Sequence, residues 1–219
     1  MVPERSAIAG NPLLTAIATQ ATSTLLLGIM LTEVVPIPAQ QIMPALFLFT
    51  GGLVQLIHSV LLLAKGNTFT AMFFATFAAF WMSLSFILLG LQNGWILEEA
   101  MTQAKDSGNG SPLGEALGAF IATWGVLSFF WWLVSFRLPL VQFVLYTLTV
   151  PAFLAAAAGF WSEPDFDNLN NTAVQAAGWI IIIIAALDFY LFLSEGLVSV
   201  GGKPLPQGPT IVSLFTRRA

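Results

Sequence analysis

Six long apolar segments, separated by short polar stretches, set the pattern of this chain. They cover residues 12–32, 41–64, 68–91, 113–136, 138–161 and 172–198. Each has the roughly 20 mainly apolar residues that an α-helix needs to cross the hydrocarbon core of a bilayer. Glycine, proline, asparagine and charged residues interrupt the apolar pattern between them, as turns do. The pattern predicts an all-α polytopic membrane protein with a six-helix transmembrane domain over 1–198 and a flexible tail at 199–219.

The composition agrees with a chain that is solvated mainly by lipid. Of its 219 residues, 57% are hydrophobic and only 8% are charged, against about 25% charged residues in an ordinary soluble domain. There is no cysteine and one histidine, His58, so neither a metal-ligand cluster nor a nucleophile–base pair is visible. The net charge is −4 and the seven basic residues are scattered. We therefore expect no cofactor, no metal, no nucleic-acid partner and no enzymatic activity.

The distribution of charge predicts the orientation in the membrane. Six of the seven basic residues lie in the N-terminal segment, at Lys65 and Arg137 between apolar segments, and in the C-terminal tail. The other loops are acidic and include Glu33, Glu98 and Glu163. Because basic loops stay on the cytoplasmic side, we expect a multi-pass protein of the cell membrane with both termini and the tail in the cytoplasm.

Polar residues inside apolar segments are the strongest pointers to function in such a chain. Asp188 lies about ten residues from the cytoplasmic end of the last segment, which is roughly 15 Å at 1.5 Å per residue. An aspartate near mid-membrane costs about 2.5–3.5 kcal/mol on insertion scales. Two interpretations stay open: a protonatable group on a solute pathway, or a hydrogen-bonded residue that holds helices together.

Short motifs in all six segments resemble those of one known family. They are Asn11-Pro12, Gly51-Gly52 with Gln55, Gly66-Asn67-Thr68-Phe69 followed by Phe80-Trp81, Leu117-Gly118, Trp124-Gly125, Gln142-Phe143, Leu148-Thr149-Val150, Ala177-Gly178-Trp179, Tyr190 and Glu195. On these motifs the chain resembles the succinate–acetate permease, or acetate uptake transporter, family over residues 11–209. The resemblance implies a six-helix protomer with its own central pore, assembled as a homo-hexamer. It also implies passage of small monocarboxylates such as acetate, and sometimes succinate, through a channel or proton-linked permease.

The resemblance further implies a constriction at mid-membrane. In the family, residues of helices one, three and five close the pore, and those positions fall here on Gln20, Phe77 and Leu148. The neighbouring position on helix six is Asp188. Each of the four lies about eight to ten residues from the cytoplasmic end of its segment, so they share a layer about 12–15 Å deep. An amide and a carboxyl group thus stand where the family usually has an aromatic and a small residue.

The carboxyl group leaves more than one function open. An ionised Asp188 would repel a carboxylate by about 4 kcal/mol at 4 Å and an effective dielectric constant of 20. Either Asp188 is protonated when an acetate-like anion passes, or the solute is not a simple anion. Gln20 with Asp188 could instead serve a channel for a neutral or cationic solute such as ammonium, urea or a short amide. A third alternative is a non-transporting scaffold with a closed pore, for which the sequence offers little.

Overall fold

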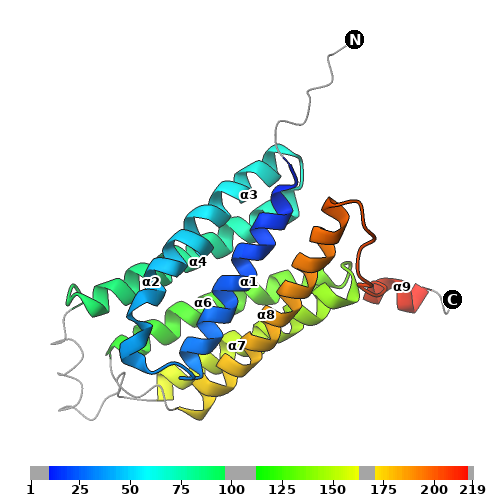
Figure 1. The fold of residues 1–219 in the computed structure, drawn as a ribbon. Coiled ribbons are helices and arrows are strands. Elements are labelled where there is room, and N and C mark those ends of the chain that lie inside the picture. The colour runs from blue at the N-terminus through cyan, green and yellow to red at the C-terminus, as the bar shows by residue number, and fades with distance from the viewer. Residues whose placement is uncertain (1–9, 97–111, 163–170, 217–219) are drawn as a thin grey trace.

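The computed structural model describes residues 10–96, 112–162 and 171–216, and these residues are mostly helical (Figure 1). The helices long and apolar enough to cross a membrane are Pro12–Leu31, Ala39–Ala64, Thr68–Gln92, Leu113–Ser135, Leu140–Ser162 and Thr172–Ser199. Their bounds agree with the six predicted segments to within two residues at each end. The prediction of an all-α protein with six membrane spans is confirmed.

Five spans are single helices and one is composite. The single helices are α1 (Pro12–Leu31), α4 (Thr68–Gln92), α6 (Pro112–Ser135), α7 (Leu140–Ser162) and α8 (Thr172–Ser199). The second span comprises the end of the 3₁₀ helix η1 (Ile37–Ile42), then α2 (Met43–Leu46), the π-helical η2 (Phe47–Val54) and α3 (Gln55–Ala64).

Local sequence explains where several helices begin. Asn11 caps α1, because its Oδ1 accepts a hydrogen bond from Leu13 N at 3.1 Å, and Pro12 takes the first helical position. Asn171 caps α8 in the same way. Gly66 has a φ of +81° in the tight turn between α3 and α4, a conformation that residues with a Cβ rarely adopt.

The helices form a bundle with two chemically different ends. α1 packs against α8, α8 against α7, α7 against α6, and α3 against both α1 and α4. The starts of α1, α4 and α7 share one end of the bundle with the ends of α3, α6 and α8 (Figure 1). The exposed Lys65, Arg137 and Lys203 adjoin these helix ends, and we term this the basic end. The opposite end carries Glu33 and Glu115.

Small residues allow α1 to approach α8 closely. A Cβ on Gly28 would lie 2.6 Å from Ile182 Cγ1 and 3.1 Å from the backbone oxygen of Gly178. A Cβ on Gly178 would in turn lie 3.0 Å from Thr32 N. Glycines at such positions let the backbones of membrane helices come together, so side-chain contacts between the two helices are short.

We expect Gly28→Ala to lower the free energy of unfolding by about 1–3 kcal/mol, the usual cost of overfilling a well-packed site. Thermal unfolding in detergent measures the loss. Gly196→Ala on α8 is the matched control, because the nearest atom to a Cβ there is Leu14 Cδ1 at 3.8 Å. Equal unfolding midpoints for the two variants would contradict the close contact.

The segment after α8, for which the sequence predicts a flexible tail, folds back on the basic end. Tyr190 Oη donates a hydrogen bond to Pro206 O at 2.6 Å. Val141 N, at the start of α7, donates one to Gln207 O at 3.0 Å, and the short helix α9 (Ile211–Thr216) follows. The partners of this segment are thus the backbone of α7 and side chains of α8, where Ser194 Oγ also accepts a hydrogen bond from Leu205 N at 3.0 Å. The last three residues of the chain lie outside the described residues.

Candidate functional site

A cavity of about 600 Å³ lies inside the bundle and is lined by residues of α1, α4, α6, α7 and α8. At the end of the bundle opposite the basic end, the cavity lining begins with the exposed Gln41, Gln92 and Gly94. At its inner part the lining includes the buried Gln20 and Phe73. On α4 the lining extends from Gln92 to Phe73, about 28 Å at 1.5 Å per residue. The cavity therefore reaches most of the way from the opposite end to the basic end.

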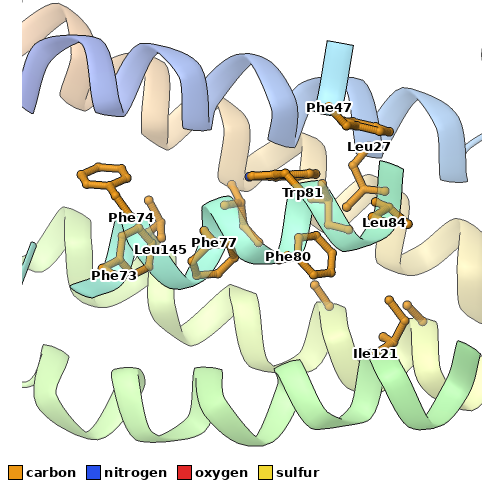
Figure 2. Packing of buried hydrophobic residues seen from close by; sticks show 14 of the residues in the cluster. Leu27, Phe47, Phe73, Phe74, Phe77, Phe80, Trp81, Leu84, Ile121 and Leu145 are labelled. Atoms are coloured by element: carbon orange, nitrogen blue, oxygen red, sulfur yellow. The ribbon is translucent and has the colours of Figure 1, made fainter. Parts of the chain in front are cut away.

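Aromatic side chains fill the space between the cavity and the basic end. The ring of Phe73 packs edge-to-face on Tyr146 and Trp131, with ring centroids 5.3 and 5.9 Å apart. It also lies against Phe77 at 4.7 Å. Figure 2 shows Phe73 and Phe77 one turn apart on the side of α4 that faces α6 and α7. Phe69, a further turn along, packs on Trp131 at 5.0 Å. These rings close the cavity on that side.

A buried hydrogen-bond network lies along the inner part of the cavity. Gln20 Oε1 accepts two hydrogen bonds, from Gln55 Nε2 at 3.0 Å and from Trp81 Nε1 at 3.2 Å. Gln20 Nε2 donates to Thr24 Oγ1 at 3.2 Å. Gln20, Thr24 and Trp81 line the cavity, whereas Gln55 is fully buried and does not. The network thus joins three spans around one amide group.

The composite second span brings these groups together. A Cβ on Gly51 would lie 2.5 Å from Trp81 Cγ and 2.6 Å from Ser23 Oγ, so glycine is needed for this close approach. Gln55 follows directly after η2, and π-helical stretches often accompany functional sites. Among the described residues, Gln55 Oε1 and Ser23 Oγ have no hydrogen-bond partner. Since a buried unpaired acceptor costs about 1–3 kcal/mol, stability alone does not explain the network.

The four predicted constriction residues lie at similar depth. Gln20, Phe77 and Leu148 come eight, nine and eight residues after the first residue of α1, α4 and α7. Asp188 comes eleven residues before the last residue of α8. These depths span about 12–17 Å. Gln20 and Phe77 line the cavity, whereas Leu148 and Asp188 are not among its lining residues. Leu148 is half-buried and packs on the hydrophobic core.

Asp188 is linked to the closed side of the cavity through one aromatic residue. Its side chain is 5% exposed, and its Oδ2 has no hydrogen-bond partner in the part of the chain that the structure describes. Tyr146 of α7 lies near enough to interact electrostatically with the carboxyl group. The ring of Tyr146 in turn packs on Phe73, which lines the cavity. The buried carboxyl group therefore lies at the depth of the inner part of the cavity without being one of its lining residues.

Most residues of the family motifs join helix ends at the basic end. Asn11 Nδ2 donates a hydrogen bond to Glu195 Oε2 at 3.4 Å, which ties the start of α1 to the end of α8. The others begin helices or pack on neighbours: Pro12 and Thr68 as the first residues of α1 and α4, Asn67 at the cap position of α4, Phe69 on Trp131, and Tyr190 on the segment after α8. Gln55 is the motif residue that reaches the polar network.

Three residues of the site were not among the predicted site residues: Thr24, Phe73 and Trp81. Helical spacing is the signal that could have found them. Phe73, Phe77 and Trp81 are four residues apart on α4, and Gln20 and Thr24 are four apart on α1. Residues at this spacing share one face of a helix, so each predicted residue marked its neighbours.

A bundle of six membrane-crossing helices around a cavity that is closed at one side by aromatic rings has the architecture of a channel or transporter. The chain belongs to the GPR1/FUN34/yaaH family, whose family model matches residues 1–200.

Individual relatives and a solved structure agree with this assignment. The succinate-acetate/proton symporter SatP of Escherichia coli (strain K12) is 31% identical over 166 residues, which cover 75% of this chain and 78% of the relative. Acetate permease A of Emericella nidulans is 25% identical over 140 residues, 64% of this chain and 46% of the fungal protein. The solved structure described as that of the bacterial acetate channel SatP has a TM-score of 0.70 at 24% identity, covering 91% of this chain and 99% of that one. The family resemblance predicted from the motifs is confirmed, and the solved structure shows a shared fold.

Proposed function

We propose that this chain is a membrane channel or proton-linked permease for small monocarboxylates such as acetate, with succinate as a further candidate solute. The cavity carries the proposal, because it extends about 28 Å into the six-helix bundle and ends at closed aromatic rings. Its wall is mainly apolar with a few placed polar groups, which suits a small organic acid. The names of the relatives, acetate permease and succinate-acetate/proton symporter, support the same class of solute.

The predicted constriction layer supplies the gate in this proposal. Gln20 and Phe77 are the members of this layer that line the cavity. Leu148 on α7 and Asp188 on α8 complete the layer. An ionised carboxyl group at this depth would repel a passing carboxylate, by about 4 kcal/mol at 4 Å and an effective dielectric constant of 20. Protonation of Asp188 therefore accompanies passage of the anion.

The proposal places the protein in the cell membrane with both termini in the cytoplasm. Lys65, Arg137 and Lys203 at the basic end support this orientation, because basic loops remain on the cytoplasmic side. The cavity then faces the outside of the cell. The predicted acidic loops at 97–111 and 163–170 lie outside the described residues. Assembly as a homo-hexamer, which the family resemblance implies, is part of the same proposal.

Uptake of labelled acetate into proteoliposomes tests the function. We expect uptake above that of empty liposomes, with a rate that rises as the pH falls. Swelling assays with ammonium and urea address the alternative of a channel for neutral or cationic solutes, which passage of acetate alone would exclude. Absence of acetate uptake at every pH would overturn the proposal.

A further inference from the structure

We infer that Gln20 and Thr24 form a donor site that binds the carboxylate group of the solute in the cavity. Gln55 and Trp81 act as positioning residues that hold the Gln20 amide in the orientation the site needs. The inference rests on the proposed function, since it assigns a binding site to the transported solute. It also decides between solute classes, because a site made of donors favours an anion over ammonium.

The orientation of the Gln20 amide follows from its neighbours. The indole N–H of Trp81 can only donate a hydrogen bond, so the Gln20 atom 3.2 Å from it is the amide oxygen. Gln55 Nε2 donates to the same oxygen at 3.0 Å. Two donors thus occupy the two lone pairs of this oxygen, and the amide nitrogen lies on the side of Thr24.

Two protons at this site have no acceptor among the residues that the structure describes. The Gln20 amide nitrogen carries two protons, and the hydrogen bond to Thr24 Oγ1 uses one of them. Thr22 and Thr149 donate their hydroxyl protons to backbone oxygens one turn earlier. Thr24 makes no such bond to any described residue, and its hydroxyl serves as an acceptor for Gln20. Because Gln20 and Thr24 both line the cavity, an amide proton and a hydroxyl proton remain for a solute.

The apolar surroundings of Gln20 and Thr24 strengthen the preference of the donor site for a hydrogen-bond acceptor. The cavity is lined around the donors by apolar side chains such as Leu27, Phe77 and Leu145, and none of its described lining residues is charged. Hydrogen bonds from neutral donors to a carboxylate are charge-assisted and about twice as strong as neutral ones. An ammonium ion would need acceptors instead, and the Gln20 oxygen is already occupied. The site therefore fits the carboxylate group of a monocarboxylate.

Acetate uptake by Gln20→Met and Gln41→Met tests the donor site. Methionine keeps the length of the Gln20 side chain but removes its donors. Gln41→Met is the matched control, because Gln41 lines the exposed part of the same cavity outside the network. We expect Gln20→Met to reduce labelled-acetate uptake about tenfold relative to Gln41→Met, the effect of losing one hydrogen bond to a charged group.

Gln20→Glu tests the predicted selectivity by reversing the hydrogen-bonding character of the site. One carboxylate oxygen can still accept from Gln55 and Trp81, and the other replaces the donor next to Thr24 with an acceptor and a charge. We expect acetate uptake to fall below that of Gln20→Met. Uptake of labelled methylammonium, a probe for small cations, is expected to rise above the wild-type level. Wild-type acetate uptake by either Gln20→Met or Gln20→Glu would overturn the assignment of the donor site.

Trp81→Phe keeps the inference testable if the Gln20 variants do not fold, as size-exclusion profiles would reveal. It removes one of the two donors to the Gln20 oxygen but keeps an aromatic ring, so the orientation of the amide is less firmly held. We expect the ratio of acetate to methylammonium uptake to fall, an effect that a purely structural role would not produce. An unchanged ratio would contradict the positioning role. Absence of acetate uptake by the wild-type protein would instead overturn the proposed function, so the two failures are distinguishable.

Discussion

Asparagine in place of Asp188 is expected to abolish the pH dependence of acetate uptake and to keep uptake high at neutral pH. In the proposed gate, ionisation of Asp188 as the pH rises places a negative charge beside the path of the anion, so uptake is expected to fall. Asparagine has nearly the same shape but cannot ionise. A repulsion of about 1.4 kcal/mol, a third of the value for charges 4 Å apart, already changes a rate tenfold.

Few other groups can produce this pH response. α1 and α7, the helices that pack against α8, carry no ionisable side chain apart from Tyr146. Glu195 lies on α8 near the basic end, where it is partly exposed and accepts a hydrogen bond from Asn11. Among the buried residues that the structure describes, Asp188 is the one with a carboxyl group. The response is therefore expected to disappear with this residue.

Initial rates of labelled acetate uptake, measured from mildly acidic to mildly alkaline pH, check this prediction. The rates of empty liposomes are subtracted, because undissociated acetic acid crosses the bilayer without a protein. Glu115→Gln is the control, since Glu115 is exposed in the first turn of α6 at the opposite end. It is expected to keep the wild-type profile. An Asp188→Asn profile parallel to that of the wild type would exclude Asp188 as the pH-sensitive group.

The limits of the six spans could be predicted because bilayer thickness sets the length of an apolar helix. The internal geometry of the second span could not. Residues 47–54 have the composition of an ordinary apolar helix, yet they form the π-helical η2. Gly51 lies within this stretch and in close contact with Trp81, a tertiary contact that local sequence does not encode. The hydrogen bond between Gln55 and Gln20 depends on this arrangement, so only the structure could reveal it.

Depth in the membrane was easier to predict than the direction in which a side chain points. Depth follows from counting residues along a helix, whereas direction depends on how neighbouring helices pack. Helices that are apolar on all sides carry little amphipathic signal to fix their rotation. Gln20 and Phe77 line the cavity, but on α7 the lining includes Leu145 and Thr149 rather than Leu148.

Leucine in place of Phe73 is expected to raise acetate uptake severalfold and to admit longer monocarboxylates such as butyrate. The Phe73 ring connects the closed side of the cavity with Tyr146 and Trp131. Leucine remains apolar but cannot contact both rings, so a path towards the basic end opens. Because part of the side chain stays, the loss of stability should be below the about 3–5 kcal/mol of a Phe→Ala exchange. Uptake of labelled acetate and butyrate into the same proteoliposomes measures the effect.

Phe74→Leu separates opening of the cavity from a general loss of core contacts. Phe74 is 4% exposed, against 8% for Phe73, but it is not among the described lining residues of the cavity. Figure 2 shows the two rings leaving α4 in different directions. Phe74→Leu is therefore expected to lower stability without admitting butyrate. If both variants changed butyrate uptake alike, loosened packing would control the passage. If neither changed it, the main barrier would not be the Phe73 ring but the constriction layer that contains Asp188, where charge rather than size would limit uptake.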